Sequence, residues 1–168
     1  MFKLFEKVKS EKVNRYIGEI HATQDGVAIP LAEVPDRVIS EGILGEGMAI
    51  IPQNGKVVSP VDGTVICVAT SGHAFGIQTS DGVDVLVHIG VDTVNLDGQG
   101  FQVYAKEGDY VLAGTPICFV DLSLLAKRNI PSHTATLISN SASFADIIPV
   151  TGEVVAGISK VIKYRTEV

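Results

Sequence analysis

Glycine-centred turn signals follow one another at short intervals from Gly18 to the end of this chain, and they leave room only for short elements between them. The intervening segments are rich in Val and Ile, which favour extended backbone. Repeated Asp-Gly and Asn-Gly pairs between such segments are typical of strands joined by tight turns. The clearest pairs are Asp25-Gly26, Asn54-Gly55, Asp62-Gly63, Asp81-Gly82 and Asp97-Gly98.

The predicted fold class is all-β, a compact antiparallel β-sandwich or partly closed barrel with a few short helical turns. With 168 residues, 46% of them hydrophobic, the chain is long enough for one self-sufficient core and too apolar for a disordered protein. We expect a single domain over residues 17–168. Asp121 is a suitable N-cap for a short helix that Pro131 stops, and single helical turns are expected at 32–38 and 143–147.

The net charge of −6 makes the chain a poor candidate for binding nucleic acid, which depends on Lys and Arg contacts with phosphates. Residues 1–16 differ from the rest. Apolar side chains there repeat at helical spacing between lysines, which fits either a turn that touches an anionic membrane surface or a terminal segment that is frayed or packed on its own domain. The basic residues of this segment, opposed by two glutamates, are Lys3, Lys7, Lys9, Lys12 and Arg15.

Neither cysteine belongs to a CxxC pair. Cys67 and Cys118 both lie in apolar, strand-like segments, so we expect two buried, reduced thiols. The sequence has no run of about 18 apolar residues and no continuous apolar stretch at its N-terminus, so it predicts neither a membrane span nor a secretory signal. A cytoplasmic location is the resulting expectation.

The segment from Ser71 to Asp92 carries two histidines on one predicted hairpin. A two-residue turn at Asp81-Gly82 would place Phe75 opposite His88 and His73 opposite Gly90. His73 and His88 would then be diagonal neighbours on one face, whereas a three-residue turn would separate them. This register puts Val83, Val85, Val87 and Ile89 on a core face, and the other face would carry His73, Phe75, Ile77, Leu86 and His88.

Such a histidine pair allows three kinds of chemistry. Zinc could use both rings, but catalytic sites usually have three protein ligands and structural sites four, and His21 and His133 have no spacing that recruits them. Base catalysis on Ser71 would lack the usual nucleophile elbow. Neutral imidazole can itself take a phosphoryl group and pass it on, while the second histidine donates a hydrogen bond to the phosphoryl oxygens.

Several motifs resemble the glucose-type enzyme IIA component of the bacterial phosphoenolpyruvate:sugar phosphotransferase system. The resemblance runs from about residue 18 to the C-terminus. Its motifs are VPD at 34–36, GEGMAI at 45–50, SPVDGT at 59–64, GHAF at 72–75, VHIGVDTV at 87–94, GQGF at 98–101 and LISN at 137–140.

The resemblance implies a β-sandwich that relays a phosphoryl group during sugar uptake. The phosphocarrier protein HPr would donate the group to Nε2 of His88, and a cysteine of a IIB domain would receive it. His73 would stabilise the group, with Ser71 beside His73 and Asp92 at the edge of the site. The Gly90 carbonyl is a candidate to hold Nδ1–H of His88.

The resemblance also implies an apolar rim where partners dock. The matching residues are Val38, Ile39, Leu44, Phe75, Leu86 and Val94. No cofactor is implied; zinc, if bound, would use His73 and His88. Relatives in enteric bacteria also regulate other proteins, and many relatives are fused to IIB and IIC modules. We expect this chain to be free-standing or excised. A β-sandwich binding module or zinc-dependent hydrolase that uses the same two histidines remains the alternative.

Overall fold

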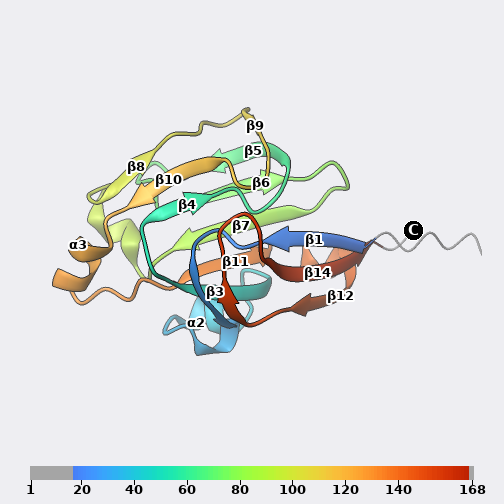
Figure 1. Cartoon of the computed structure of the whole chain (residues 1–168), viewed down its shortest axis with the longest axis horizontal. Coiled ribbons are helices and arrows are strands. Elements are labelled where there is room, and N and C mark those ends of the chain that lie inside the picture. Colours follow the sequence, from blue (N-terminus) through green and yellow to red (C-terminus); the bar gives the residue numbers. More distant parts are fainter. Residues whose placement is uncertain (1–16, 167–168) are drawn as a thin grey trace, which may run out of the picture.

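The structure, a computed structural model, describes residues 17–166, and almost all of its regular structure is antiparallel strand. The predicted N-terminal segment 1–16 lies outside the described residues, and the single domain expected over residues 17–168 stays a prediction. An eight-stranded sheet has the order β13-β2-β3-β11-β7-β6-β5-β9, and two three-stranded sheets have the orders β1-β14-β12 and β4-β10-β8 (Figure 1).

The eight-stranded sheet carries the residues discussed below. Its strands are β2 (Gly26–Pro30), β3 (Glu46–Pro52), β5 (Gly63–Val68), β6 (Ala74–Gln78), β7 (Asp84–Ile89), β9 (Tyr110–Val111), β11 (Thr134–Ile138) and β13 (Gly152–Val154). The smaller sheets comprise β1 (Ile17–His21), β14 (Lys160–Thr166), β12 (Phe144–Pro149), β4 (Lys56–Val58), β10 (Pro116–Val120) and β8 (Phe101–Val103).

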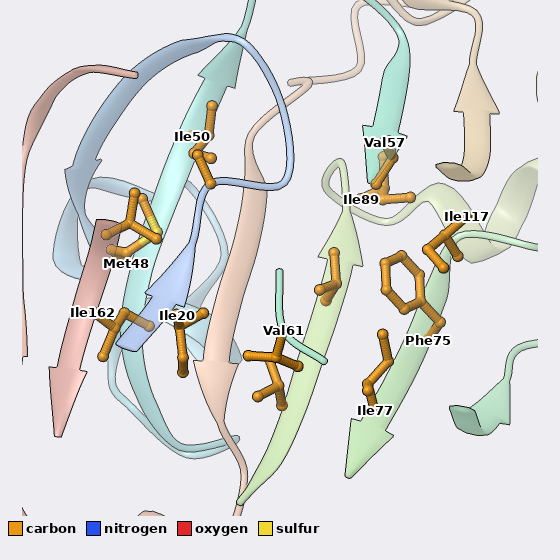
Figure 2. Packing of buried hydrophobic residues seen from close by; sticks show 14 of the residues in the cluster. Ile20, Met48, Ile50, Val57, Val61, Phe75, Ile77, Ile89, Ile117 and Ile162 are labelled. Atoms are coloured by element: carbon orange, nitrogen blue, oxygen red, sulfur yellow. The ribbon is translucent and has the colours of Figure 1, made fainter. Parts of the chain in front are cut away.

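The main core lies between the inner face of the large sheet and the two small sheets. Ile20 of β1 and Ile162 of β14 face Met48 of β3, which closes one half of this sandwich (Figure 2). In the other half, Phe75 and Ile77 of β6 pack in the same cluster as residues of β4 and β10. The predicted antiparallel β-sandwich is therefore confirmed.

A second, smaller core covers part of the outer face of the large sheet. The segment that contains η1 (Leu31–Glu33) and α2 (Arg37–Ser40) packs Val34 and Ile39 against Ala135 and Leu137 of β11. Asp36 caps α2, because its Oδ1 accepts hydrogen bonds from the backbone N–H groups of Val38 and Ile39. Leu86 of β7 packs against this smaller core, so the end of β7 lies at its edge.

The short helices only partly follow the sequence expectation. Asp121 caps α3 (Leu122–Lys127) as predicted, with Oδ1 accepting from the Leu124 N–H. The expected turn at 32–38 is replaced by η1 and the later α2. The expected turn at 143–147 is wrong. The helical turn η3 (Ser141–Ser143) ends at residue 143, and the following residues form β12, which pairs with β14. No helix among residues 17–166 is both long and apolar enough to cross a bilayer.

Both cysteines are free, but only one is buried. Cys118 of β10 lies in the main core, where desolvation raises the pKa of its thiol to about 12. Cys67 is exposed, so the expectation of two buried thiols is wrong for that residue. A register shift in β5 between Val65 and Cys67 brings the thiol opposite Gly76, on the outer face of the sheet.

The hairpin register also differs from the prediction. Ala74 pairs with His88 and Phe75 with Val87, because the turn is one residue longer than expected. The Thr79 N–H donates to the Val83 carbonyl, and Gly82 lies between them with φ of 85°. As a result Phe75 and Ile77 join the core face with Val85 and Val87, and they do not share the face of His88.

We predict that Phe75→Ala lowers the free energy of unfolding by about 3–5 kcal/mol, because the ring is only 1% exposed and its loss leaves a cavity in the main core. Urea denaturation measures this change. Val38→Ala, at a side chain that is 47% exposed, is the control and should change it by about 0.5 kcal/mol or less. A loss below about 1 kcal/mol for Phe75→Ala would contradict the core placement.

Candidate functional site

Two imidazole rings meet on the outer face of the large sheet, at the end of β7. The centroids of His73 and His88 are 5.2 Å apart, and the ring planes cross at 79°. His88 points outward because β7 alternates, with Val85, Val87 and Ile89 buried in the main core. The predicted proximity of the two histidines is therefore correct, although the register from which it followed is not.

His73 reaches this face because it precedes the regular part of β6. It follows Gly72, whose φ of 75° is a conformation that favours glycine, and the strand begins only at Ala74. The alternation of the strand therefore does not fix the direction of the His73 side chain. Its backbone is nevertheless anchored, since the Ile89 N–H donates to the His73 carbonyl over 2.8 Å.

Ser71 forms a hydrogen bond that affects which nitrogen of the His73 ring carries the proton. Its Oγ lies 2.6 Å from Nδ1 of His73, so the two residues share a hydrogen bond, and the expectation that Ser71 lies beside His73 is correct. When the Ser71 hydroxyl donates to Nδ1, the proton of the neutral ring lies on Nε2. His73 then presents an N–H donor from its other nitrogen.

The nitrogen atoms of His88 have different environments. Nδ1 is buried and lacks a partner at hydrogen-bonding geometry, whereas the residue as a whole is half-buried, so Nε2 is the nitrogen directed to the surface. The backbone of Gly90 raises the pKa of His88, so it favours a proton on the ring. The sequence suggested the Gly90 carbonyl as the acceptor for Nδ1–H, and the two atoms do not meet at full hydrogen-bonding geometry.

Burial and charge act in opposite directions on His88. Desolvation lowers the pKa of His88 most, and the Gly90 backbone, Asp36 and Asp92 partly offset it by raising that pKa. Desolvation and the charge of His88 also lower the pKa of His73. Both rings are therefore held neutral at pH 7, and a neutral imidazole has the lone pair that a nucleophile needs.

Asp92 and Asp36 are the two carboxylates that act on His88. Asp92 was predicted at the edge of the site, and it adopts a left-handed conformation with φ of 56° just after the strand. Asp36 was not selected as a site residue, although it belongs to the VPD motif at 34–36. Its N-cap position marks the start of α2 but gives no signal of its effect on His88, which depends on the packing of this segment.

The predicted docking rim is only partly at the surface. Val38 is exposed, Val94 is 52% exposed, and Leu44 and Leu86 are half-buried against the smaller core. Ile39 is 2% exposed and Phe75 lies in the main core, so neither side chain can contact a partner. The rim prediction is wrong for these two residues because one faces the sheet from α2 and the other follows the corrected register. Ile43, beside Leu44, is exposed and was not predicted.

The remaining histidines do not complete a metal site. Across the described part of the chain, no group of three or more His, Cys, Asp or Glu side chains is arranged to hold a metal ion. His133 contributes its carbonyl, which accepts from the Gly90 N–H over 2.9 Å, and His21 lies on β1. His73 and His88 therefore offer zinc two ligands here, and further ligands would have to come from elsewhere.

We predict that lowering the pH from about 7.5 to about 5.5 decreases the free energy of unfolding. The pKa values of His73 and His88 are lower in the folded than in the unfolded chain, so protonation favours unfolding. The contribution of the two neutral rings to the free energy of unfolding is complete above the histidine pKa of the unfolded chain, about 6.5, and it declines as the pH falls below that value. Urea midpoints at the two pH values measure the loss. The double variant His73→Gln/His88→Gln should lose less; an equal loss would contradict this origin.

A protein family, several sequences and a solved structure are similar to this chain over most of its length. A family described as "phosphoenolpyruvate-dependent sugar phosphotransferase system, EIIA 1" matches residues 18–144. The glucose-specific EIIA component of Haemophilus influenzae is 39% identical over 163 residues, which cover 96% of this chain and 98% of that protein. The solved structure of glucose permease IIA from Mycoplasma capricolum superimposes with a TM-score of 0.82 at 38% identity, covering 88% of this chain and 96% of that one.

Some relatives are much longer. The glucose-specific EIIBCA component of Corynebacterium glutamicum is 40% identical over 145 residues, 86% of this chain but only 22% of that protein. The chain thus spans about a fifth of the length of such relatives. The family match, the near full-length relatives and the shared sandwich agree with one another. This chain belongs to the EIIA 1 family of the phosphoenolpyruvate-dependent sugar phosphotransferase system, a family of phosphotransferase components.

Proposed function

We propose that this protein carries a phosphoryl group on Nε2 of His88, taking it from phosphorylated HPr and delivering it to a cysteine of a IIB domain during sugar uptake. The observation that carries the proposal is the histidine pair: two desolvated rings 5.2 Å apart, one with its Nδ1 buried. Longer relatives named EIIBCA combine this kind of domain with EIIB and EIIC parts in one chain.

In the first transfer, the lone pair on Nε2 of His88 attacks the phosphorus atom carried by HPr. A P–N bond forms to His88 as the P–N bond to the HPr imidazole breaks, and that imidazole leaves with the bonding electrons. In the second transfer, the thiolate of the IIB cysteine attacks phosphorus, and the P–N bond to His88 breaks. Both steps depend on positioning and on charge stabilisation more than on covalent chemistry by other groups.

His73 supports these transfers from the side. With Ser71 donating to its Nδ1, the Nε2–H of His73 can donate to a phosphoryl oxygen of the group on His88. The 5.2 Å separation of the ring centroids leaves room for that oxygen beside the two rings. His73 therefore stabilises charge that develops during transfer.

Asp36 and Asp92 give the phosphorylated state its transience. Both carboxylates lie close enough to His88 to affect its pKa. Once His88 carries a phosphoryl group, the same carboxylates repel its negative charge. We infer that this repulsion favours onward transfer, and that a partner with a basic side chain near its reactive atom relieves it during docking.

Partners would dock on the apolar groups that border the two rings. The side chains available are Val38, Ile43 and Val94, with Leu44 and Leu86 partly accessible. A small apolar rim suits brief contacts between carriers. We propose a cytoplasmic location, where these phosphocarriers meet.

We predict that incubation with phosphoenolpyruvate, enzyme I and HPr adds one phosphoryl group, detected by intact mass at alkaline pH. His88→Ala should abolish the addition, because it removes the nucleophile. His73→Ala should still accept the group but transfer it to a IIB domain much more slowly. His133→Ala is the matched control, since its side chain is not part of the pair, and should behave as wild type. Phosphorylation of His88→Ala would refute the assignment.

The histidine pair also supports a second candidate, a zinc-binding module or zinc-dependent hydrolase. Two imidazoles at this separation supply half of a tetrahedral site. Elemental analysis of the purified protein tests for bound zinc, and chelation tests its need. We expect phosphoryl acceptance to be unchanged after chelation, because no step above uses a metal. Stoichiometric zinc whose removal stops the transfer would favour the second candidate.

A further inference from the structure

The turn that follows β7 contains a buried threonine whose hydroxyl serves the strand end. Thr93, the first residue of η2 (Thr93–Leu96), is 0% exposed. Its Oγ1–H donates to the carbonyl of Ile89 over 2.5 Å. The hydrogen bond closes a short loop from the last residue of β7 to the start of η2, with Gly90 and Asp92 between them in left-handed conformations.

Ile89 connects this threonine to both histidines. Its N–H donates to the carbonyl of His73 over 2.8 Å, and Ile89 directly follows His88 in β7. The Ile89 side chain is fully buried in the main core and cannot shift freely. The hydroxyl of Thr93 therefore holds the carbonyl of Ile89, the residue that follows His88 and whose N–H binds the backbone of His73.

The methyl group of Thr93 lies against Gly90. A Cβ on Gly90 would lie 2.4 Å from Cγ2 of Thr93, so the glycine backbone packs directly on that methyl. On the other side, the Gly90 N–H donates to the His133 carbonyl over 2.9 Å, and the Val91 N–H donates to the Pro131 carbonyl over 3.0 Å. Gly90 is thus held between Thr93 and the loop before β11.

The orientation of Gly90 affects protonation of His88, because the Gly90 backbone raises the pKa of that ring. A carbonyl directed at Nδ1 favours the tautomer with the proton on Nδ1, which leaves the lone pair on Nε2. If Gly90 turned away, the influence of its carbonyl on the buried Nδ1 would be lost and the proton could move to Nε2. The nitrogen at the surface would then have no lone pair.

We propose that Thr93 is a positioning residue for His88: its hydroxyl, bonded to the Ile89 carbonyl, holds the turn so that the Gly90 carbonyl is directed toward Nδ1, and this keeps Nε2 as the reactive nitrogen. The role of Thr93 in transfer rests on the proposed function, whereas its control of the His88 tautomer does not. Thr93 contacts neither the phosphoryl group nor a partner, and it acts only through the turn.

Two substitutions separate the hydroxyl from the methyl. Thr93→Val keeps a methyl under Gly90 and removes the donor to Ile89, while Thr93→Ser keeps the donor. The matched control is Thr136→Val on β11, because Thr136 is also 0% exposed, pairs with Val87, and has a hydroxyl with no partner among the described residues. Thermal unfolding first establishes which variants are folded.

The tautomer of His88 is read from its imidazole 15N chemical shifts, a signature that a change in stability alone would not move. We expect wild type, Thr93→Ser and Thr136→Val to show the proton on Nδ1, and Thr93→Val to show a mixture of tautomers. Acceptance from phosphorylated HPr should slow about 10- to 100-fold in Thr93→Val, because a small displacement of a reacting group has an effect of that size.

Unchanged 15N shifts in a folded Thr93→Val variant, or the same change in Thr136→Val, would overturn the proposal. Thr93→Ala replaces Thr93→Val if the latter does not fold. If neither folds, Thr93→Ser decides: a folded Ser variant with mixed tautomers refutes the role of the hydroxyl, and one with the wild-type tautomer supports it. If wild type accepts no phosphoryl group while the tautomer still depends on Thr93, the proposed function fails and the positioning role stands.

Discussion

The alternation of β7 is the constraint on which the site depends. Val85, Val87 and Ile89 face the main core, and their burial fixes the strand between β6 and β11. Because successive side chains of a strand point to opposite faces, the same burial directs His88 outward. The main core thus fixes the direction of a side chain on the opposite face of the sheet, and a one-residue slip would bury His88 and expose the valines.

Desolvation is the second element of the site. Burial lowers the pKa of both imidazoles, since a charged ring is poorly solvated there, and the charge of His88 lowers the pKa of His73 further. Asp36 and Asp92 oppose this effect without reversing it. The result is a pair of neutral rings beside two negative charges.

The core face of β7 was predictable from alternation, and the position of Ser71 beside His73 from the family resemblance, whereas their hydrogen bond is seen only in the structure. Phe75 was misplaced because the length of a Gly-containing turn cannot be counted from the sequence, and one extra residue inverts the partner strand. His73 still met His88, because Gly72 frees it from the alternation that the prediction assumed.

The sequence by itself determined the β-sandwich, through its turn glycines and its short Val- and Ile-rich segments, and it selected the two histidines through the motifs around them. Those signals are local, so they can be read along the chain. Only the tertiary structure decided that Asp36 acts on His88, that Thr93 supports Gly90 and Ile89, and that Ile39 is covered while Val38 is not. These facts depend on segments that are distant in sequence or on the direction of single side chains, and packing rather than local pattern fixes both.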